Sequence, residues 1–458
     1  MQDDSAPRWL PVLSPDGGSV FLQIADALQA AVTQGQLQPG DRLPPQRRLA
    51  AQLQVDLTTV TRAYDEARRR QLLEGRGARG TYIAAPKVAL SAVLDLSMNT
   101  PPPPQGVDFD DLLRQGLAHV LRGTDSALLM TYHLGGGSDA DRQAGALWLT
   151  PMLGSVDFQQ VLVCPGAQAA IAAVILAFTH PGDVILSEST SYPGLRAAAT
   201  ALGRRLVGVA SDGQGMHPES LEHACHVHRP ALLYLNPTLH NPTTRTMPAA
   251  RRQALAQVIM RHQLRTIEDD PYWLLADAPP APLATLAPQQ VCYIATLSKC
   301  LTPGLRVAFV VLHDAHARER FLAALRSFAL MVAPVSAALA TQWILDGTAA
   351  TLMAGVRQEA RQRHWMARDL LAGRYSGTGD GLHVWLELPS YWNALQLAHA
   401  ADRAGIAVTP AQAFAMDGQG ANAIRISLGN IKARAHLQAG LQRLSQLLAQ
   451  RPDHPAVV

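Results

Sequence analysis

The N-terminal eighty residues place apolar side chains at the spacing of short amphipathic helices. A first helix is predicted by apolar residues three and four positions apart: Phe21, Ile24, Leu28 and Val32. A short helix follows at about 46–53, and Asp56 can cap a longer helix that runs to about Leu73. A glycine-rich hairpin is then predicted at 74–83. Three helices followed by a hairpin are the layout of a winged helix–turn–helix.

Beyond about residue 95 the pattern changes to short apolar runs that alternate with longer helical segments. Seven runs of four to six residues fit buried strands: 161–164, 183–186, 206–209, 231–235, 265–268, 291–295 and 306–311. Because helical segments separate most of these runs, they predict an α/β fold with a mostly parallel sheet. After about residue 350, a long helix, short strands and a closing helix around 433–449 indicate a smaller α+β subdomain.

These changes of pattern predict four parts of the chain. The winged helix–turn–helix occupies 15–84 and a linker occupies 85–94. The large α/β domain follows at 95–345, and the small C-terminal subdomain at 346–452.

The composition narrows the class of protein. The 458 residues are 48% hydrophobic and 16% charged with a net charge of +3, which excludes a mainly disordered chain. No apolar run approaches the ~20 residues of a membrane helix, and the acidic start lacks the basic region of a secretory signal. Four cysteines in this length form no disulfide framework. We therefore expect a cytoplasmic protein that does not bind membranes.

Positive charge is concentrated in the predicted helix–turn–helix. Residues 42–82 contain nine arginines against four acidic residues, a local charge of +5, whereas residues 1–41 carry −4. Such a local excess favours a polyanion-binding surface, and double-stranded DNA is the expected partner. The residues expected to contact DNA lie on the second and third helices and in the hairpin: Arg47, Thr58, Thr59, Arg62, Arg76 and Arg79.

Lysine is scarce in this chain, which makes the position of Lys299 informative. Only three of the 39 basic residues are lysines, and Lys299 lies in the apolar stretch 291–309, on a loop between two predicted strands. A lysine among apolar residues and beside another cation has a lowered pKa, and its free amine can form a Schiff base. Arginine cannot replace lysine in that chemistry.

Residues near other predicted strand ends supply what pyridoxal 5′-phosphate (PLP) requires. Asp269 ends a strand and can keep the pyridine nitrogen of PLP protonated. Gly166 opens a helix, where free backbone amides bind phosphate. Tyr272 and Asn241 can bind the ring hydroxyl. Tyr192 can stack on the face of the ring. The phosphate can be bound by Ala167, Gln168 and Arg306. Open α/β sheets bind ligands at the carboxyl ends of their strands.

Four segments of the N-terminal part carry a family resemblance. They read Leu-Gln-Pro-Gly-Asp-Arg-Leu-Pro at 37–44, Arg-Arg-Leu-Ala at 47–50, Thr-Val-Thr-Arg-Ala-Tyr at 59–64 and Gly-Ala-Arg-Gly-Thr-Tyr at 77–82. In this order and spacing they resemble the GntR-type DNA-binding domain. The pattern departs at Asp56-Leu57, where the family often has Ser-Arg, so the resemblance implies no particular operator sequence.

Residues 95–450 resemble the fold-type-I aminotransferases, which bind PLP, and the whole chain resembles the MocR-type regulators, which join a GntR head to such a domain. The resemblance implies that Lys299 bonds covalently to PLP and that Asp269 pairs with its ring nitrogen. It implies that Asn241 and Tyr272 bind the ring oxygen. It also implies a phosphate site with these members: Ala167, Gln168, Thr296, Ser298 and Arg306.

The same resemblance assigns two further residues. Tyr132, in Tyr-His-Leu-Gly-Gly-Gly at 132–137, matches the tyrosine that reaches the phosphate of the neighbouring subunit, which implies a homodimer. Arg425, in Ile-Arg-Ile-Ser at 424–427, matches the arginine that binds a substrate carboxylate, here that of an effector.

Three functions are compatible with these features. The first is a PLP-dependent transcriptional regulator that senses PLP, an amine or an amino acid, and the charged head favours it. The second is an active aminotransferase that carries a DNA-binding head. The third is a purely structural dimerisation domain, which the joint presence of the PLP-binding residues disfavours. We expect the regulator, with no more than residual transaminase activity.

One more motif has residue types that bind metals. It contains His223, Cys225, His226 and His228. On a helix this spacing spreads the side chains over several faces, so no metal site is expected.

Overall fold

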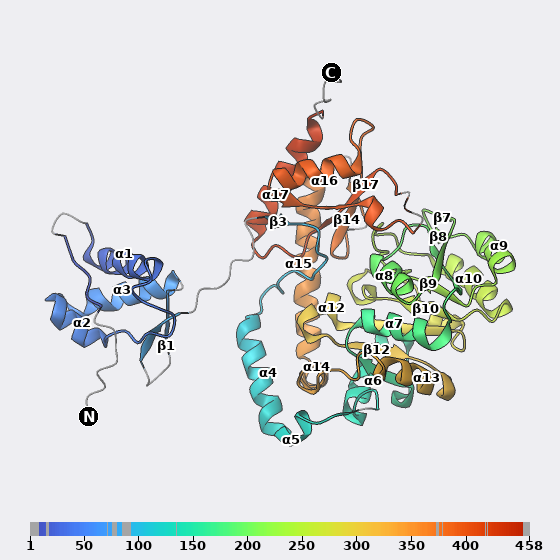
Figure 1. Cartoon of the computed structure of the whole chain (residues 1–458), viewed down its shortest axis with the longest axis horizontal. Helices are drawn as coiled ribbons and strands as arrows, with labels where there is room; N and C mark the ends of the chain where they lie inside the picture. The colour runs from blue at the N-terminus through green and yellow to red at the C-terminus, as the bar shows by residue number, and fades with distance from the viewer. Residues whose placement is uncertain are drawn as a thin grey trace. The chain divides into compact units, whose positions relative to one another are not determined.

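The computed structural model forms two compact units, Met1–Ala92 and Val93–Val458, coloured blue and cyan to red in Figure 1. It describes residues 9–14, 18–70, 72–75, 80–84, 93–133, 135–371, 375–377, 379–416, 418 and 420–451. Most of the predicted linker lies outside the described residues. Within the described ranges, no helix has the length and apolar character needed to cross a membrane.

The smaller unit is a winged helix–turn–helix, as the sequence predicted. Its elements are α1 (Val20–Thr33), α2 (Gln46–Leu53), α3 (Leu57–Arg69), β1 (Leu73–Gly75) and β2 (Thr81–Ile83). The three helices share one apolar core, in which Leu28, Leu49 and Tyr64 are almost completely buried. This core gives the unit a fixed shape on which α3 is presented.

The two ends of α3 have different local causes. At its start, the Asp56 side chain accepts a hydrogen bond from the Thr58 backbone N–H at 2.7 Å. At its end, the helix stops at Arg69 instead of continuing to about residue 73. The helix stops because Leu73 begins β1, pairs with Ile83 and buries its side chain in the core.

A seven-stranded sheet forms the centre of the larger unit. In sheet order its strands are β4 (Val161–Cys164), β12 (Ala308–Val311), β11 (Val291–Thr296), β10 (Thr266–Asp269), β9 (Leu232–Leu235), β5 (Val184–Glu188) and β6 (Arg205–Val209). All seven predicted runs correspond to these strands. Six run parallel to one another, and β12 is antiparallel to both of its neighbours. The sheet is therefore mostly parallel, as predicted.

Helices cover both faces of this sheet, which explains why most of its strands are apolar on both sides. The central strand β10 also buries the polar residues Glu268 and Asp269. One apolar core joins the sheet to α7 (Ala167–Phe178), α8 (Pro193–Ala201) and α13 (Ala315–Arg326). The core on the other face includes residues of α4 (Phe109–Gly123), α5 (Ser126–Leu129), α6 (Asp139–Leu153), α9 (Pro218–His228), α10 (Ala249–Arg261), α11 (Leu283–Leu286), α12 (Leu297–Cys300) and α14 (Pro334–Leu345). We call the sheet with these helices the large lobe.

The rest of the larger unit forms a small lobe. Its antiparallel sheet contains, in order, β13 (Tyr375–Ser376), β14 (His383–Glu387), β17 (Ala423–Ser427) and β16 (Thr409–Pro410). This sheet packs with α16 (Ala394–Arg403) and α17 (Arg434–Ala449). The long helix α15 (Thr348–Leu370) connects the two lobes (Figure 1).

Two short strand pairs complete the larger unit. β7 (Ser211–Asp212) and β8 (Gly215–Met216) form a hairpin. β3 (Leu94–Asp95) pairs in parallel with β15 (Ile406–Ala407), so the first residues of the unit belong to the small lobe. This long-range pairing brings the segment after the predicted linker close to the residues described next.

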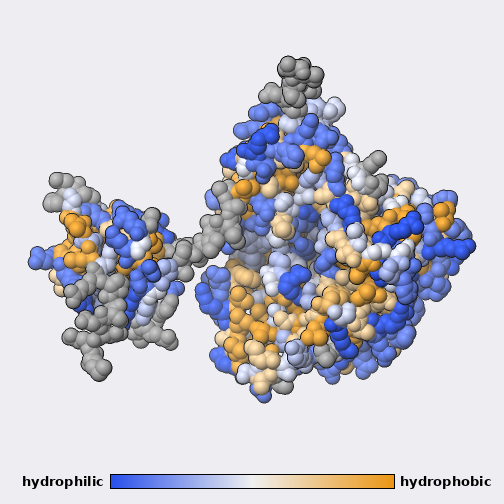
Figure 2. All heavy atoms as spheres, in the orientation of Figure 1, coloured by the Kyte–Doolittle hydropathy of each residue, from blue (hydrophilic) through white to orange (hydrophobic). Residues whose placement is uncertain are grey.

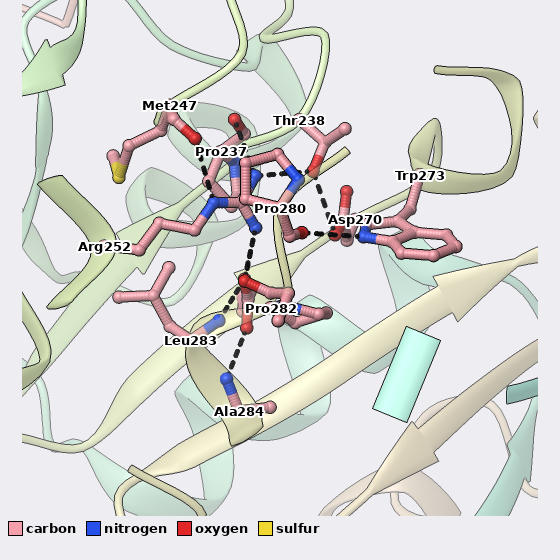
Figure 3. A network of polar contacts seen from close by, with 12 residues as sticks. Pro237, Thr238, Met247, Arg252, Asp270, Trp273, Pro280, Pro282, Leu283 and Ala284 are labelled. Carbon is pink, nitrogen blue, oxygen red and sulfur yellow. Dashed lines mark hydrogen bonds and ion pairs between the residues drawn. The ribbon is translucent and has the colours of Figure 1, made fainter. Parts of the chain in front are cut away.

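A buried polar network supports the end of β10 (Figure 3). Arg252 of α10 is fully buried, donates to Thr238 Oγ1 at 3.0 Å and lies 3.7 Å from Glu268 Oε1. Glu268 also accepts hydrogen bonds from the first two backbone N–H groups of α11. The neighbouring Asp270 accepts a hydrogen bond from Thr238 at 3.1 Å. These contacts fix the backbone on both sides of Asp269.

Candidate cofactor and DNA-binding sites

Lys299 lies in α12, the single helical turn that follows β11. Thr296 caps this turn with its side chain. The Lys299 Nζ donates a hydrogen bond to the backbone oxygen of Asn99 at 2.5 Å. Burial lowers the pKa of Lys299 to about 8, and the positive charges of Arg425 and Arg306 act in the same direction. About a tenth of the Lys299 amines are therefore neutral at pH 7, and about half at pH 8.

Asp269 is the last residue of β10, and only one of its two carboxylate oxygens accepts a hydrogen bond from a described residue. Its Oδ2 accepts a hydrogen bond from the Tyr234 hydroxyl at 2.7 Å, and its backbone oxygen accepts one from the Asn236 side chain at 2.6 Å. Its Oδ1 is buried and has no hydrogen-bond partner among the described residues. Burial raises the pKa of Asp269 to about 7, an effect that the Tyr234 hydrogen bond opposes. A buried oxygen of this kind fits a bound N–H donor.

Tyr272 and Asn241 line the same cavity as Lys299. Tyr272 is almost completely buried, and its hydroxyl accepts a hydrogen bond from Asn99 Nδ2 at 2.8 Å. Burial raises the pKa of Tyr272, so the hydroxyl keeps its proton and can donate to a ligand oxygen. Asn241 accepts a hydrogen bond from Arg425 at 2.9 Å.

The start of α7 and Arg306 form a candidate anion site. Gly166 precedes α7 with a φ of +89°, and a Cβ there would lie 2.4 Å from Arg306 Nη2, so this position requires glycine. The backbone N–H groups of Ala167 and Gln168 belong to the first turn of α7, where the helix offers no acceptor. Three further predicted residues line the same cavity: Tyr192, Thr296 and Ser298.

Arg425 reaches the cavity from β17 of the small lobe. Its guanidinium donates to the backbone oxygen of Ser97 and to Asn241 Oδ1, and it lies 4.9 Å from the centre of the Phe414 ring. Its Nε is buried and has no hydrogen-bond partner among the described residues. The guanidinium therefore keeps free N–H donors beside the Ser97 carbonyl, and a bound carboxylate could accept from them.

The two lobes together enclose this cavity, which has a volume of about 430 Å³. Lining residues that the sequence did not assign to the cavity include Ser97, Met98, Asn99, Asn236, Thr409 and Phe414. Tyr234, which supports Asp269, was not assigned either. The hydroxyl of Tyr234 within an apolar strand was a usable signal, but no spacing connects Asn99 to Lys299. Tyr132 does not line the cavity of its own chain, and 72% of its surface is exposed.

The predicted DNA contacts on α2 and α3 are mostly exposed. Arg47, Thr58 and Arg62 are exposed, and Thr59 is half-buried. The Thr58 hydroxyl donates to the capping Asp56, and the Arg62 guanidinium lies 4.3 Å from the centre of the Phe21 ring. Two other predicted contacts lie outside the described residues: Arg76 and Arg79.

Comparisons with known proteins match both units. Residues 93–443 match the model of the family described as aminotransferase class I and II. Residues 21–83 match that of the bacterial regulatory proteins of the gntR family. The HTH-type transcriptional regulator YdeF of Bacillus subtilis is 30% identical over 96% of both chains. The vitamin B6 salvage pathway transcriptional repressor PtsJ of Salmonella typhimurium is 29% identical, over 90% of this chain and 95% of PtsJ.

A solved structure is similar to the larger unit. The α-aminoadipate aminotransferase LysN of Thermus thermophilus, complexed with N-(5′-phosphopyridoxyl)-L-leucine, matches with a TM-score of 0.71 and 27% identity. The match covers 78% of this chain and 92% of LysN.

Proposed function

The chain belongs to the aminotransferase class I and II family and carries a gntR-family DNA-binding domain. This combination is the MocR-type architecture, and from it we propose that the protein is a PLP-binding transcriptional regulator. It would bind DNA through the smaller unit and sense PLP, an amine or an amino acid in the larger one. One observation carries the proposal: a single cavity contains a buried amine, a carboxylate oxygen without a partner and an anion site built on glycine.

The residues of the cavity fit PLP group by group. Bound PLP would supply an aldehyde that condenses with amines and a ring that withdraws electrons. Lys299 would hold it covalently, and Asp269 Oδ1 would accept the hydrogen bond of the ring N–H. Tyr272 would donate to the ring oxygen, while Tyr192 would pack on the ring face. The first-turn N–H groups of α7 and the Arg306 fork would bind the phosphate.

The names of the relatives favour a regulator over an active aminotransferase that has gained a DNA-binding domain. Relatives that match this chain over nearly its whole length, YdeF and PtsJ, are named as regulators, and PtsJ is named for vitamin B6 salvage. The second candidate, an active aminotransferase, is favoured by the presence of Arg425 in the cavity, where a substrate carboxylate could bind.

We infer that the regulator is a homodimer. Figure 2 shows a patch of hydrophobic residues on the larger unit, over the region of α4 and α14. Exposed apolar side chains in or next to α4, α5 and α14 include Leu121, Met130 and Leu345. Tyr132 is two residues after Met130 in the sequence, and its side chain is highly exposed in the single chain. A second copy would cover these side chains and would give Tyr132 a partner.

The test combines cofactor and DNA binding in the full chain. Purified protein incubated with PLP should absorb visible light, and borohydride should fix the cofactor to Lys299. Lys299→Ala should lose both signals and keep its circular dichroism.

The wild-type protein should also enrich specific duplexes from a random DNA pool. Protein that ignores PLP contradicts the cofactor proposal. Absence of enrichment, together with rapid multiple-turnover production of a keto acid, would favour the aminotransferase.

A further inference from the structure

Three metal-ligating side chains converge at the junction of α9 and α10, and none of them lines the PLP cavity. Glu222 and His226 lie one turn apart on α9, and His262 directly follows the last residue of α10. Each offers one ligand atom, and these three atoms lie within 4.8 Å of one another. They come from two helices that pack together through buried apolar residues.

Two of the three separations between ligand atoms can be compared with those in a tetrahedral metal site. Glu222 Oε1 lies 3.3 Å from His226 Nε2 and 2.6 Å from His262 Nε2. The two imidazole rings meet edge to face, with their centres 5.0 Å apart. Ligands around zinc at about 2.0–2.2 Å are about 3.3–3.5 Å apart in a tetrahedron. The first separation already has this value, and the second must open by about 0.7 Å.

Arg261 supports the carboxylate in a way that suits metal coordination. Its guanidinium binds Glu222 Oε2, which leaves Oε1 facing the two imidazoles. Hydrogen bonds to the non-coordinating oxygen orient carboxylate ligands in metal sites.

We propose that Glu222, His226 and His262 bind a divalent cation of the zinc class, with solvent water completing its coordination. Two imidazoles and one carboxylate are ligands that Zn²⁺ accepts in proteins. The His226 side chain is 69% exposed, so water can reach the open position. The ion would tie α9 to the end of α10. Of the four residues in the histidine-rich motif, only His226 belongs to this cluster.

The test uses the full chain, loaded with PLP, treated with EDTA and dialysed before titration with Zn²⁺ alone. Calorimetry should give one Zn²⁺ per chain in the wild type. His226→Ala and His262→Ala should each weaken binding by about tenfold or more, whereas His223→Ala, on the same helix but outside the cluster, should bind as the wild type does. Co²⁺ in place of Zn²⁺ should give visible absorption bands that the two variants lose.

Three results would overturn the proposal: no saturable binding in the wild type, unchanged binding in both variants, or an equal loss in the His223→Ala control. Circular dichroism in EDTA checks that each variant is folded. Should His262→Ala fail that check, Glu222→Gln replaces it, because glutamine keeps the shape and hydrogen bonding of the side chain but supplies no anionic ligand.

Discussion

Lys299 combines burial, neighbouring cations and one hydrogen bond, and its reactivity should depend on pH. Its pKa of about 8 lies below the ordinary value because the amine is buried beside Arg425 and Arg306. The neutral fraction of the amine therefore grows as pH rises towards 8 and then levels off. The rate of covalent PLP attachment should rise by up to about tenfold per pH unit below pH 7 and flatten above pH 8.

Stopped-flow absorbance of apo protein mixed with PLP between pH 6 and 9.5 measures this profile. A lysine with an ordinary pKa near 10.4 gives a rate that still rises at pH 9.5. Such a rise would contradict the lowered pKa.

The sequence predicted the chemistry of the cavity better than its support. Lys299 and Asp269 could be named because each follows an apolar strand run and carries a reactive group. Asn99 could not, since it reaches Lys299 and Tyr272 only after a fold that closes about 170 to 200 residues of chain. Hydrogen bonds between residues so far apart leave no periodic signal in a sequence.

Among the elements, α7 depends on a glycine at its start. Gly166 has φ +89° and ψ 162°, and Gly154 at the end of α6 has φ +74° and ψ −150°, so both occupy backbone regions that nearly require glycine. A Cβ at Gly166 meets the Arg306 guanidinium at 2.4 Å, whereas one at Gly154 meets nothing within 4 Å. Substitution at either position would strain the backbone, but only Gly166 lies next to the candidate anion site at Arg306.

Gly166→Ala and Gly154→Ala form a matched pair of variants. Both should lose about 1–3 kcal/mol of stability through backbone strain. Only Gly166→Ala should also lose PLP affinity, by about tenfold or more, because its Cβ displaces the Arg306 fork. Fluorescence titration with PLP and thermal unfolding measure the two effects. Equal PLP affinity in the two variants would contradict the proposal that the start of α7 binds the phosphate.

Strands were easier to predict than their partners. Most long strands of the large lobe are largely apolar runs, because helices cover both faces of the sheet, although β10 carries Glu268 and Asp269. The two-residue strands β3 and β15 carry no such pattern, and only their long-range pairing makes them strands. For this reason the sequence indicated the layers of the fold and missed the contribution of residues 94–99 to the small lobe and the cavity.

For the whole molecule, the salt dependence of DNA binding reports on α3. Arg62 is exposed, packs on Phe21 and forms no ion pair among those found in the described chain, so its charge is available to a phosphate. Arg62→Ala should make the slope of log K against log salt less negative by about one. Arg69→Ala is the control, because Arg69 is paired with Glu66 at the other end of α3. Fluorescence anisotropy with a selected duplex gives both slopes, and an unchanged slope for Arg62→Ala would exclude a phosphate contact.

Residues 97–99 follow closely on the segment that joins the two units, and we expect ligand binding to change their contacts. PLP bonded to Lys299 would alter the amine that donates to the Asn99 carbonyl, and a carboxylate bound by Arg425 would lie close to the Ser97 carbonyl that Arg425 also contacts. A ligand shifts DNA affinity only if it binds two conformations differently, typically by ~1–3 kcal/mol or about 5–150-fold. Operator affinity should therefore differ between the apo, PLP-loaded and PLP-plus-amino-acid states.

Two variants identify the effector that drives this change. If an amino acid is the effector, Arg425→Ala should keep the visible absorbance of bound PLP and lose the response, because no other guanidinium among the described residues lining the cavity comes from the small lobe. If PLP itself is the effector, Arg425→Ala should respond normally, and Lys299→Ala or Arg306→Ala should lose the response. Anisotropy titrations of one duplex in the three states separate these outcomes. Equal affinity in all states would exclude sensing by this cavity, because a ligand that leaves DNA affinity unchanged has no free-energy coupling to the head.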